Sequence, residues 1–284
     1  MIKVNDFLYG KMEFPQVIAD LLETDVLKRL AGVHQSGAIF LVNPDICHSR
    51  LEHATGVMML IKILGGSDLE QIAGLLHDVS HTAFSHVGDY VFENTNEDYH
   101  ETIFNEVIEN SDIPAVLMKH GYHSDQIING EFNILEQDLP SLCADRLDYT
   151  LRDGIYGGII SRQRAKEFLN GIILKDGKIA VTIEKEALWI NKTFERLNKE
   201  VFKLPLHLYA NGKMAELIKE FLNKGLLVKD DLFKTDTLLL NKIRSNYEGY
   251  EAVKSIKQLK GFAEFMRHGA VPKVKARSLK ALLA

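Results

Sequence analysis

Residues 67–86 read SDLEQIAGLLHDVSHTAFSH, and this stretch decides the fold. Its apolar residues recur at the spacing of a helix that packs one face on a core, at Leu69, Ile72, Leu76 and Val79. His77, Asp78 and His81 leave this helix near its C-terminal end. Polar side chains at the end of an apolar helix indicate a pocket.

Two serines open helices with the same S-x-x-E pattern, Ser49 with Glu52 and Ser67 with Glu70. In such a capping box, the serine hydroxyl and the glutamate side chain satisfy free amide groups at the helix start. The first box predicts that His53 lies in the first turn of its helix.

A further helix is expected to open near Pro140, because proline is favoured in a first turn. It should run through SLCADRLDYTLRD and stop at Gly154. Asp145, Tyr149 and Asp153 then stand at i, i+4 and i+8, which places them on one face.

The one clear strand signal is GIILKDGKIAVTIE (171–184), where two β-prone runs flank Asp176-Gly177 and predict a hairpin with a tight turn. Helical periodicity returns after Leu188. We therefore expect an all-α fold, a helical bundle with a small β-hairpin and a C-terminal helical extension. The basic stretch VPKVKARSLKALLA (271–284) is interpreted as a solvated or docking helix, with a binding function as the alternative.

Composition narrows the classes of partner. With 34 basic and 39 acidic residues the net charge is −5, so no general attraction to nucleic acid is expected. No apolar run approaches the roughly 20 residues that cross a bilayer, which predicts no membrane partner. Two cysteines give no disulfide framework, and MIKVNDFLYG (1–10) lacks the apolar core of a signal peptide, so we expect a cytoplasmic protein.

Histidines are clustered in this chain. Six of its 11 histidines fall within about fifty residues, at His48, His53, His77, His81, His86 and His100. The pair His77-Asp78 offers an imidazole nitrogen and a carboxylate oxygen, a donor set suited to a divalent ion with open positions. An HD dipeptide also occurs by chance, and its histidine can simply be hydrogen-bonded in the core. The surrounding sequence therefore decides between a metal ligand and a core histidine.

That context resembles a known family. The segments HSRLEHATGV (48–57), IAGLLHDVSHTAFSH (72–86), YHE (99–101) and CADRLDYTLRDG (143–154) resemble the HD-domain phosphohydrolases, most closely the deoxynucleoside triphosphate triphosphohydrolase (dGTPase-like) branch. The resemblance implies an HD-domain helical bundle in which His53, His77, Asp78 and Asp145 coordinate one divalent metal ion. We expect an HD metal-binding core at 1–165, with the β-hairpin and C-terminal helical region at 166–284 packed on it.

The resemblance also implies roles around the metal. His81, His86, Asp89 and His100 match polar residues assigned to proton transfer, with His86 as the acid, although core histidines satisfied by hydrogen bonds are the alternative. Gln35 matches a contact to deoxyribose, Arg50 a phosphate clamp, Tyr149 a residue under the sugar, and Asp153 a partner of the 3′-hydroxyl. For Arg50 and Asp153 the alternative is an ordinary salt bridge.

The resemblance is weaker in VFKLPLHLYANGKMAELI (201–218), where this branch places an arginine for the phosphate tail and a tyrosine-glutamine pair beside the base. Here no arginine occurs, and the nearest candidates are Lys203, Tyr209, Asn211 and Lys213. Because lysine gives a point charge in place of a bidentate fork, the number of substrate phosphates stays open.

The expected function is metal-dependent hydrolysis of a small nucleotide, a dNTP giving a deoxynucleoside and triphosphate. A nucleotidase or phosphatase acting on monophosphates is one alternative, and a non-catalytic nucleotide-binding HD module is another. The donor set favours manganese or iron, while magnesium, nickel and zinc remain open. Because family members often assemble, a homo-oligomer, dimer or larger, is an alternative to a monomer.

Overall fold

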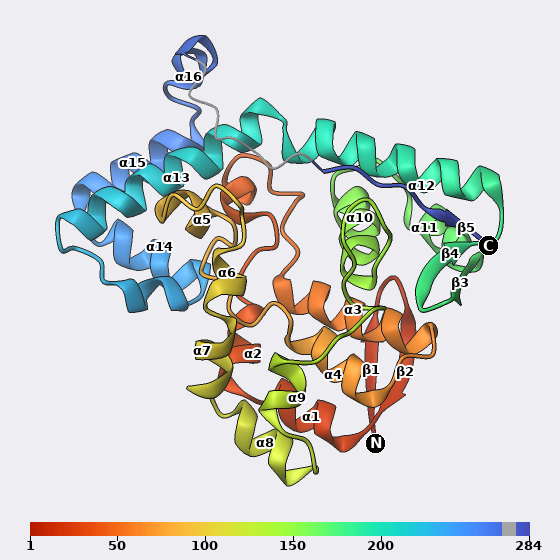
Figure 1. Ribbon diagram of the computed structural model, residues 1–284. Coiled ribbons are helices and arrows are strands. Elements are labelled where there is room, and N and C mark those ends of the chain that lie inside the picture. The colour runs from red at the N-terminus through yellow and green to blue at the C-terminus, as the bar shows by residue number, and fades with distance from the viewer. Residues whose placement is uncertain (269–276) are drawn as a thin grey trace.

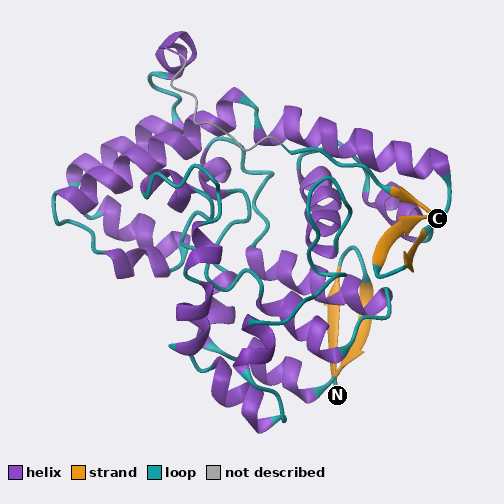
Figure 2. Cartoon of the chain, in the orientation of Figure 1, coloured by secondary structure: helices purple, strands orange, loops and turns teal. Residues whose placement is uncertain are grey.

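The computed structural model describes residues 1–268 and 277–284, and helices form most of it (Figure 2). The strands are confined to two small sheets at the edge of the helical body. Within the described residues, no helix combines the length and apolar character needed to cross a bilayer. The expectation of an all-α fold is confirmed.

The helices follow one another along most of the chain (Figure 1). They are α1 (Gln16–Leu22), α2 (Asp25–Leu30), η1 (Gly37–Leu41), α3 (Arg50–Ile63), α4 (Asp68–Leu76), α5 (Val87–Val91), α6 (Tyr99–Thr102), α7 (Phe104–Glu109), α8 (Ile113–Lys119), α9 (Ser124–Ile128), α10 (Ala144–Tyr156), α11 (Arg162–Leu169), α12 (Glu184–Leu197), η2 (Asn198–Phe202), α13 (Pro205–Asn223), η3 (Lys229–Phe233), α14 (Asp236–Arg244), α15 (Tyr247–Lys257) and α16 (Phe262–His268).

The predicted capping boxes open α3 and α4 as expected, with one difference. Ser49 and Glu52 form the complete reciprocal box, which fixes the start of α3 and places His53 in its first turn. Ser67 caps α4 by accepting from the amide of Glu70, at 3.1 Å. The Glu70 carboxylate, however, accepts from the amide of Ile134, at 2.7 Å, so it ties the loop before α10 to α4.

The helix that carries Asp145 is shifted from its predicted bounds. It begins at Ala144 and ends at Tyr156, so the expected start near Pro140 and the stop at Gly154 are both wrong. The start is delayed because the amides of Ala144 and Asp145 bond to the carbonyls of Ile134 and Leu135, 2.7 and 3.2 Å away. The shift leaves Asp145 in the first turn, close to the helix end that favours an anion.

The β-structure is larger than predicted. The hairpin β3 (Ile172–Lys175) and β4 (Lys178–Val181) is confirmed, with positive φ at Asp176 and Gly177 in its two-residue turn. A second hairpin, β1 (Ile2–Asp6) with β2 (Gly10–Phe14), was not predicted. The short strand β5 (Leu282–Leu283) adds in parallel to β4, so residues 277–284 are extended and the helix expected over 271–284 is wrong for them. Residues 271–276 of that expectation lie outside the described residues.

Three hydrophobic clusters fill the described part of the molecule, and the two larger ones use residues from either side of position 165. The larger core joins α3, α4 and α10 to β4 and α12, for example Leu60 to Val181 and Ile190. The second joins Phe84, before α5, to α13, α14 and α15, including Ile218. The boundary at 165 therefore stays a prediction, while α13–α16 supply the expected C-terminal helical region.

Candidate metal centre and active site

The four predicted metal ligands meet at one point between three helices. His53 comes from the first turn of α3, His77 and Asp78 follow the end of α4, and Asp145 lies in the first turn of α10. His53 Nε2 is 2.9 Å from Asp145 Oδ1 and 3.7 Å from Asp78 Oδ2. His77 Nε2 is 3.5 Å from Asp78 Oδ1 and 3.5 Å from Asp145 Oδ1. Two imidazole nitrogens and two carboxylates thus converge.

The orientation of both imidazoles fits a bound cation. His77 Nδ1 bonds to the carbonyl oxygen of Gly74, at 2.8 Å, which turns Nε2 toward the carboxylates. That Nε2 atom is buried and makes no hydrogen bond within the described residues. An unsatisfied buried imidazole nitrogen beside carboxylate oxygens matches the mixed donor set of a divalent metal. His53, His77 and Asp78 can hold such an ion together.

Electrostatics favours a positive charge at this point. Burial opposes protonation of His53, but hydrogen bonds to Asp145 and Asp148 outweigh it and raise the pKa of His53 to about 10. Burial likewise opposes the charge on His77, yet the neighbouring Asp78 raises its pKa. Without a cation, protons compensate the carboxylates, and a metal ion that binds there must displace them.

One residue that supports the ligands was missed by the sequence reasoning. Asp148 Oδ2 lies 2.8 Å from His53 Nδ1 and so holds the ring with Nε2 toward the centre. Arg152 binds the same carboxylate through Nε at 2.9 Å and Nη2 at 3.0 Å, and reaches Asp6 Oδ2 through Nη1 at 3.0 Å. The sequence does indicate this ion pair, because Asp148 and Arg152 stand at i, i+4 on the same helix.

Helix α3 makes room for this pair through Gly56. A Cβ atom there would lie 2.1 Å from Arg152 Nη2 and 2.2 Å from Asp148 Oδ1. Any side chain at position 56 would therefore displace the carboxylate that orients His53.

Asp148→Asn is expected to weaken metal binding by about 10–100-fold, the usual effect of losing a carboxylate behind a ligating histidine. The asparagine still accepts a hydrogen bond from His53 but carries no charge. Calorimetric titration with Mn²⁺ measures the change. Asp230→Asn, which changes an exposed aspartate in η3, is the matched control and should bind Mn²⁺ as the unmodified protein does. Equal affinities in the two variants would rule out this role for Asp148.

The four residues predicted for proton transfer form one cluster beside the ligands. The His81 and His100 rings stack with centroids 3.8 Å apart, and His81 Nε2 is 3.3 Å from Asp78 Oδ1. Burial lowers the pKa of His81 and lowers that of His100 to about 3, so both rings are neutral at pH 7. His86 is more exposed, and its Nδ1 lies 2.9 Å from Asp89 Oδ2. A carboxylate that fixes an accessible imidazole is typical of a proton donor.

The comparisons with known proteins agree with this geometry. A family model described as HD domain matches residues 50–153. The uncharacterized protein YdhJ of Bacillus subtilis is 43% identical over 86% of this chain and 76% of its own length. This chain belongs to the HD-domain family.

More distant HD-domain relatives have named activities. The metal-dependent phosphohydrolase cns2 of Cordyceps militaris is 28% identical over 79% of this chain and 67% of its own length. A Dictyostelium discoideum homolog of the deoxynucleoside triphosphate triphosphohydrolase SAMHD1 is 30% identical over 58% of this chain, which spans 39% of that protein. A crystal structure of a hypothetical Aquifex aeolicus protein, 22% identical, superposes with a TM-score of 0.72 over 91% of this chain and 76% of its own, which shows a shared fold.

The HD centre lies on the wall of a cavity of about 1080 Å³. Four of the predicted substrate contacts line this cavity, namely Gln35, Arg50, Tyr149 and Asp153. The other three, Lys203, Tyr209 and Lys213, do not line it. The Tyr209 hydroxyl donates to the carbonyl of Lys260, and Lys213 pairs with Glu216 on the surface. Helix α13 contributes Leu208 and Asn211 instead.

Arg50 and Asp153 are engaged within the HD-domain cavity. Arg50 Nη1 donates to Asp78 Oδ2 at 2.5 Å and Nε to Ser85 Oγ at 2.7 Å, while its buried Nη2 has no hydrogen-bond partner among the described residues. Asp153 Oδ1 lies 2.6 Å from His48 Nε2. Arg50 is therefore ion-paired with Asp78, and Asp153 is hydrogen-bonded to His48. Arg50 keeps one donor, Nη2, for a ligand.

Two cavity arginines were not among the predicted site residues of this HD protein. Arg146, one position after the ligand Asp145, lies on the wall with Nε buried and without a hydrogen-bond partner in the described chain. Arg277 reaches the wall from the extended C-terminal segment. Residues 201–218 contain no arginine, but these two arginines from other segments reach the cavity.

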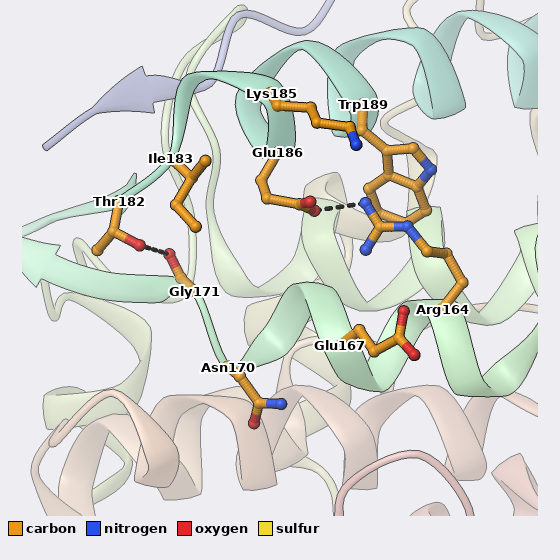
Figure 3. Close-up of a pocket in the computed structure, with 9 residues that line it drawn as sticks. All are labelled: Arg164, Glu167, Asn170, Gly171, Thr182, Ile183, Lys185, Glu186 and Trp189. Carbon is orange, nitrogen blue, oxygen red and sulfur yellow. Dashed lines mark hydrogen bonds and ion pairs between the residues drawn. The ribbon is translucent and has the colours of Figure 1, made fainter.

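A second hollow, of about 440 Å³, lies between α11, β4 and α12 (Figure 3). Arg164 lies over the Trp189 ring, 3.9 Å from its centroid, and is paired with Glu186. Because that charge is already neutralised and none of the predicted site residues lines this hollow, we assign the chemistry to the larger cavity.

Proposed function

We propose that this HD-domain chain is a metal-dependent phosphohydrolase that cleaves a dNTP into a deoxynucleoside and triphosphate. The observation that carries the proposal is the convergence of His53, His77, Asp78 and Asp145 near the His86–Asp89 pair. Of these residues, His77, Asp78, His86 and Asp145 line one cavity. The names of cns2 and of the SAMHD1 homolog support a phosphoester substrate. The donor set favours manganese or iron.

The reaction requires activation of water, charge stabilisation and a proton for the leaving oxygen. His53, His77, Asp78 and Asp145 would hold a divalent ion, which would supply the activation of water by lowering its pKa and would polarise a phosphoryl oxygen. Arg50 donates through its unpartnered Nη2 to a phosphate oxygen. His86 donates its Nε2 proton to the leaving oxygen, while Asp89 holds the ring through Nδ1.

A deoxyribose subsite is supported by three residues on the same wall. Tyr149 and Asp153 follow Asp145 at one-turn intervals along α10, so the sugar would lie next to the metal. Gln35 faces the cavity, and its buried Oε1 has no hydrogen-bond partner in the described structure. A buried unsatisfied acceptor favours a ligand with a donor such as a hydroxyl.

Hydrolysis of a nucleoside monophosphate is a second candidate, favoured by the charges on the cavity wall. Seven carboxylates line the cavity, against three guanidinium groups. The carboxylates are Asp78, Glu97, Glu101, Glu136, Asp138, Asp145 and Asp153, and the guanidinium groups belong to Arg50, Arg146 and Arg277. Repulsion between these carboxylates and a phosphate chain increases with each phosphate added.

Incubation with Mn²⁺ and a panel of dNTPs, dNMPs and p-nitrophenyl phosphate tests the proposal. We expect dNTPs to release inorganic triphosphate with no orthophosphate, because His86 would protonate the sugar oxygen. Orthophosphate from dNMPs alone would establish the second candidate. Tight nucleotide binding without release of either product would identify a non-catalytic HD module and refute hydrolysis.

A further inference from the structure

Residues 277–284, here the C-terminal strap, run along α12 to the small sheet (Figure 1). The backbone of the strap is anchored at several points. The amide of Lys280 donates to the carbonyl of Pro140 at 2.8 Å, and that of Ala281 to Asn191 Oδ1 at 2.9 Å. Leu282 and Leu283 pair with β4, and the amide of Ala284 donates to the carbonyl of Val181 at 3.0 Å.

The strap also buries apolar side chains, since Leu279 and Ala281 pack against the larger core. Main-chain hydrogen bonds and this packing hold its course without any help from the side chain of Arg277. A change confined to that side chain should therefore leave the strap in place.

Arg277 extends from the strap into the cavity that contains the metal centre. Its Nη2 donates to Glu97 Oε2 at 2.5 Å, and both side chains are largely buried, 21% and 5% exposed. Arg277 and Tyr149, the residue proposed to lie under the sugar, both line this cavity. Glu97 thus holds the guanidinium in an orientation fixed before any ligand binds.

We propose that Arg277, delivered by the C-terminal strap, is a phosphate-binding residue of the catalytic cavity. Glu97 engages Nη2, while the structure shows no partner among the described residues for Nη1 or Nε, which remain available for phosphate oxygens. A guanidinium presents its donors in a rigid planar fork that matches phosphate oxygens, whereas a lysine presents a point charge on a flexible stem. The inference deepens the proposed phosphohydrolase function, since it supplies the basic group that residues 201–218 lack.

Calorimetry with the magnesium complex of inorganic tripolyphosphate, titrated into the metal-loaded protein, tests this role. Arg277→Gln is expected to raise the dissociation constant at least tenfold, and Arg277→Lys to fall between that value and the original. Lys280→Gln is the matched control: it removes the same charge from the same strap at an exposed side chain, and should change the constant less than twofold.

The outcomes separate this inference from the proposed function because binding is measured without turnover. Tripolyphosphate affinity that is unchanged in Arg277→Gln, equally weakened in Lys280→Gln, or absent from the unmodified protein would overturn the role of Arg277. If Arg277→Gln does not fold, the tripolyphosphate affinity of Arg277→Lys is measured in its place. An unchanged affinity in Arg277→Lys would count against a bidentate contact of Arg277 with phosphate. A protein that binds tripolyphosphate through Arg277 but hydrolyses no nucleotide would refute only the proposed activity. Where dNTP is hydrolysed, Arg277→Gln should raise KM and leave kcat within threefold.

Discussion

Changing His77 and Asp78 together to alanine is expected to remove the bound metal and to reduce hydrolysis to background. The variant loses two of four converging donors, and the remaining His53 and Asp145 cannot hold the ion alone. Because His77 and Asp78 follow the last residue of α4 and lie outside its helical turns, the helical circular dichroism signal should be retained, although Arg50 loses its partner Asp78. Elemental analysis of the purified variant measures the metal directly.

A matched control is available on the surface. Asp20 and His120 form an ion pair of 2.9 Å away from the cavity, so Asp20→Ala with His120→Ala removes the same side-chain types. That variant should keep one metal per chain and full activity. Stoichiometric metal in the His77/Asp78 variant would exclude the assigned ligands.

Arg152→Met is expected to lower the free energy of unfolding by about 3–5 kcal/mol, the usual effect of removing one partner from a buried ion pair. The Arg152 guanidinium is inaccessible and lies between the carboxylates of Asp148 and Asp6. Asp6 in turn accepts from the amides of Leu8 and Tyr9 in the turn between β1 and β2. The substitution would remove the shared guanidinium from two buried carboxylates and loosen the link from the N-terminal hairpin to His53.

Urea denaturation followed by circular dichroism measures this change. Arg196→Met serves as the control, because Arg196 forms an i, i+4 pair with Glu200 on an exposed face. Its transition should stay near that of the unmodified protein. Coincident transitions for the two variants would show that the Asp148–Arg152–Asp6 network does not contribute to stability.

The positions of the four proposed metal ligands on their helices could be predicted because local sequence signals set those positions. The start of a helix depends on the few residues around its N-cap. The capping box of Ser49 and Glu52 therefore predicts the position of His53 on α3 without knowledge of tertiary contacts. The apolar spacing of α4 likewise predicted that His77 and Asp78 lie just beyond its C-terminal end. Helical periodicity grouped Tyr149 and Asp153 on one face of α10, and both line the cavity.

Contacts between distant segments could not be predicted in this way. Asp6 and Arg152 are 146 positions apart, and Arg277 and Glu97 are 180 apart, so no periodic pattern connects either pair. The sequence of the strap does not indicate a strand, because β5 is only two residues long and its hydrogen bonds are made with β4. A strand that is stabilised mainly by pairing with a distant segment is hard to recognise from its own residues.

Of the three candidates on α13, Asn211 lines the cavity, whereas Tyr209 and Lys213 do not. Leu208 and Asn211 turn toward the cavity, whereas Tyr209 packs in the second core with Phe262 and Phe265. The rotation of a helix about its axis depends on its packing partners, and α16 supplies those for Tyr209.

An anomalous diffraction map of a crystal soaked in Mn²⁺ locates the bound metal. One strong peak is expected, about 2.0–2.3 Å from His53 Nε2, His77 Nε2 and a carboxylate oxygen each of Asp78 and Asp145. A peak bound by other residues, or a fully soaked crystal without a peak at this point, would show that these four residues do not hold the metal.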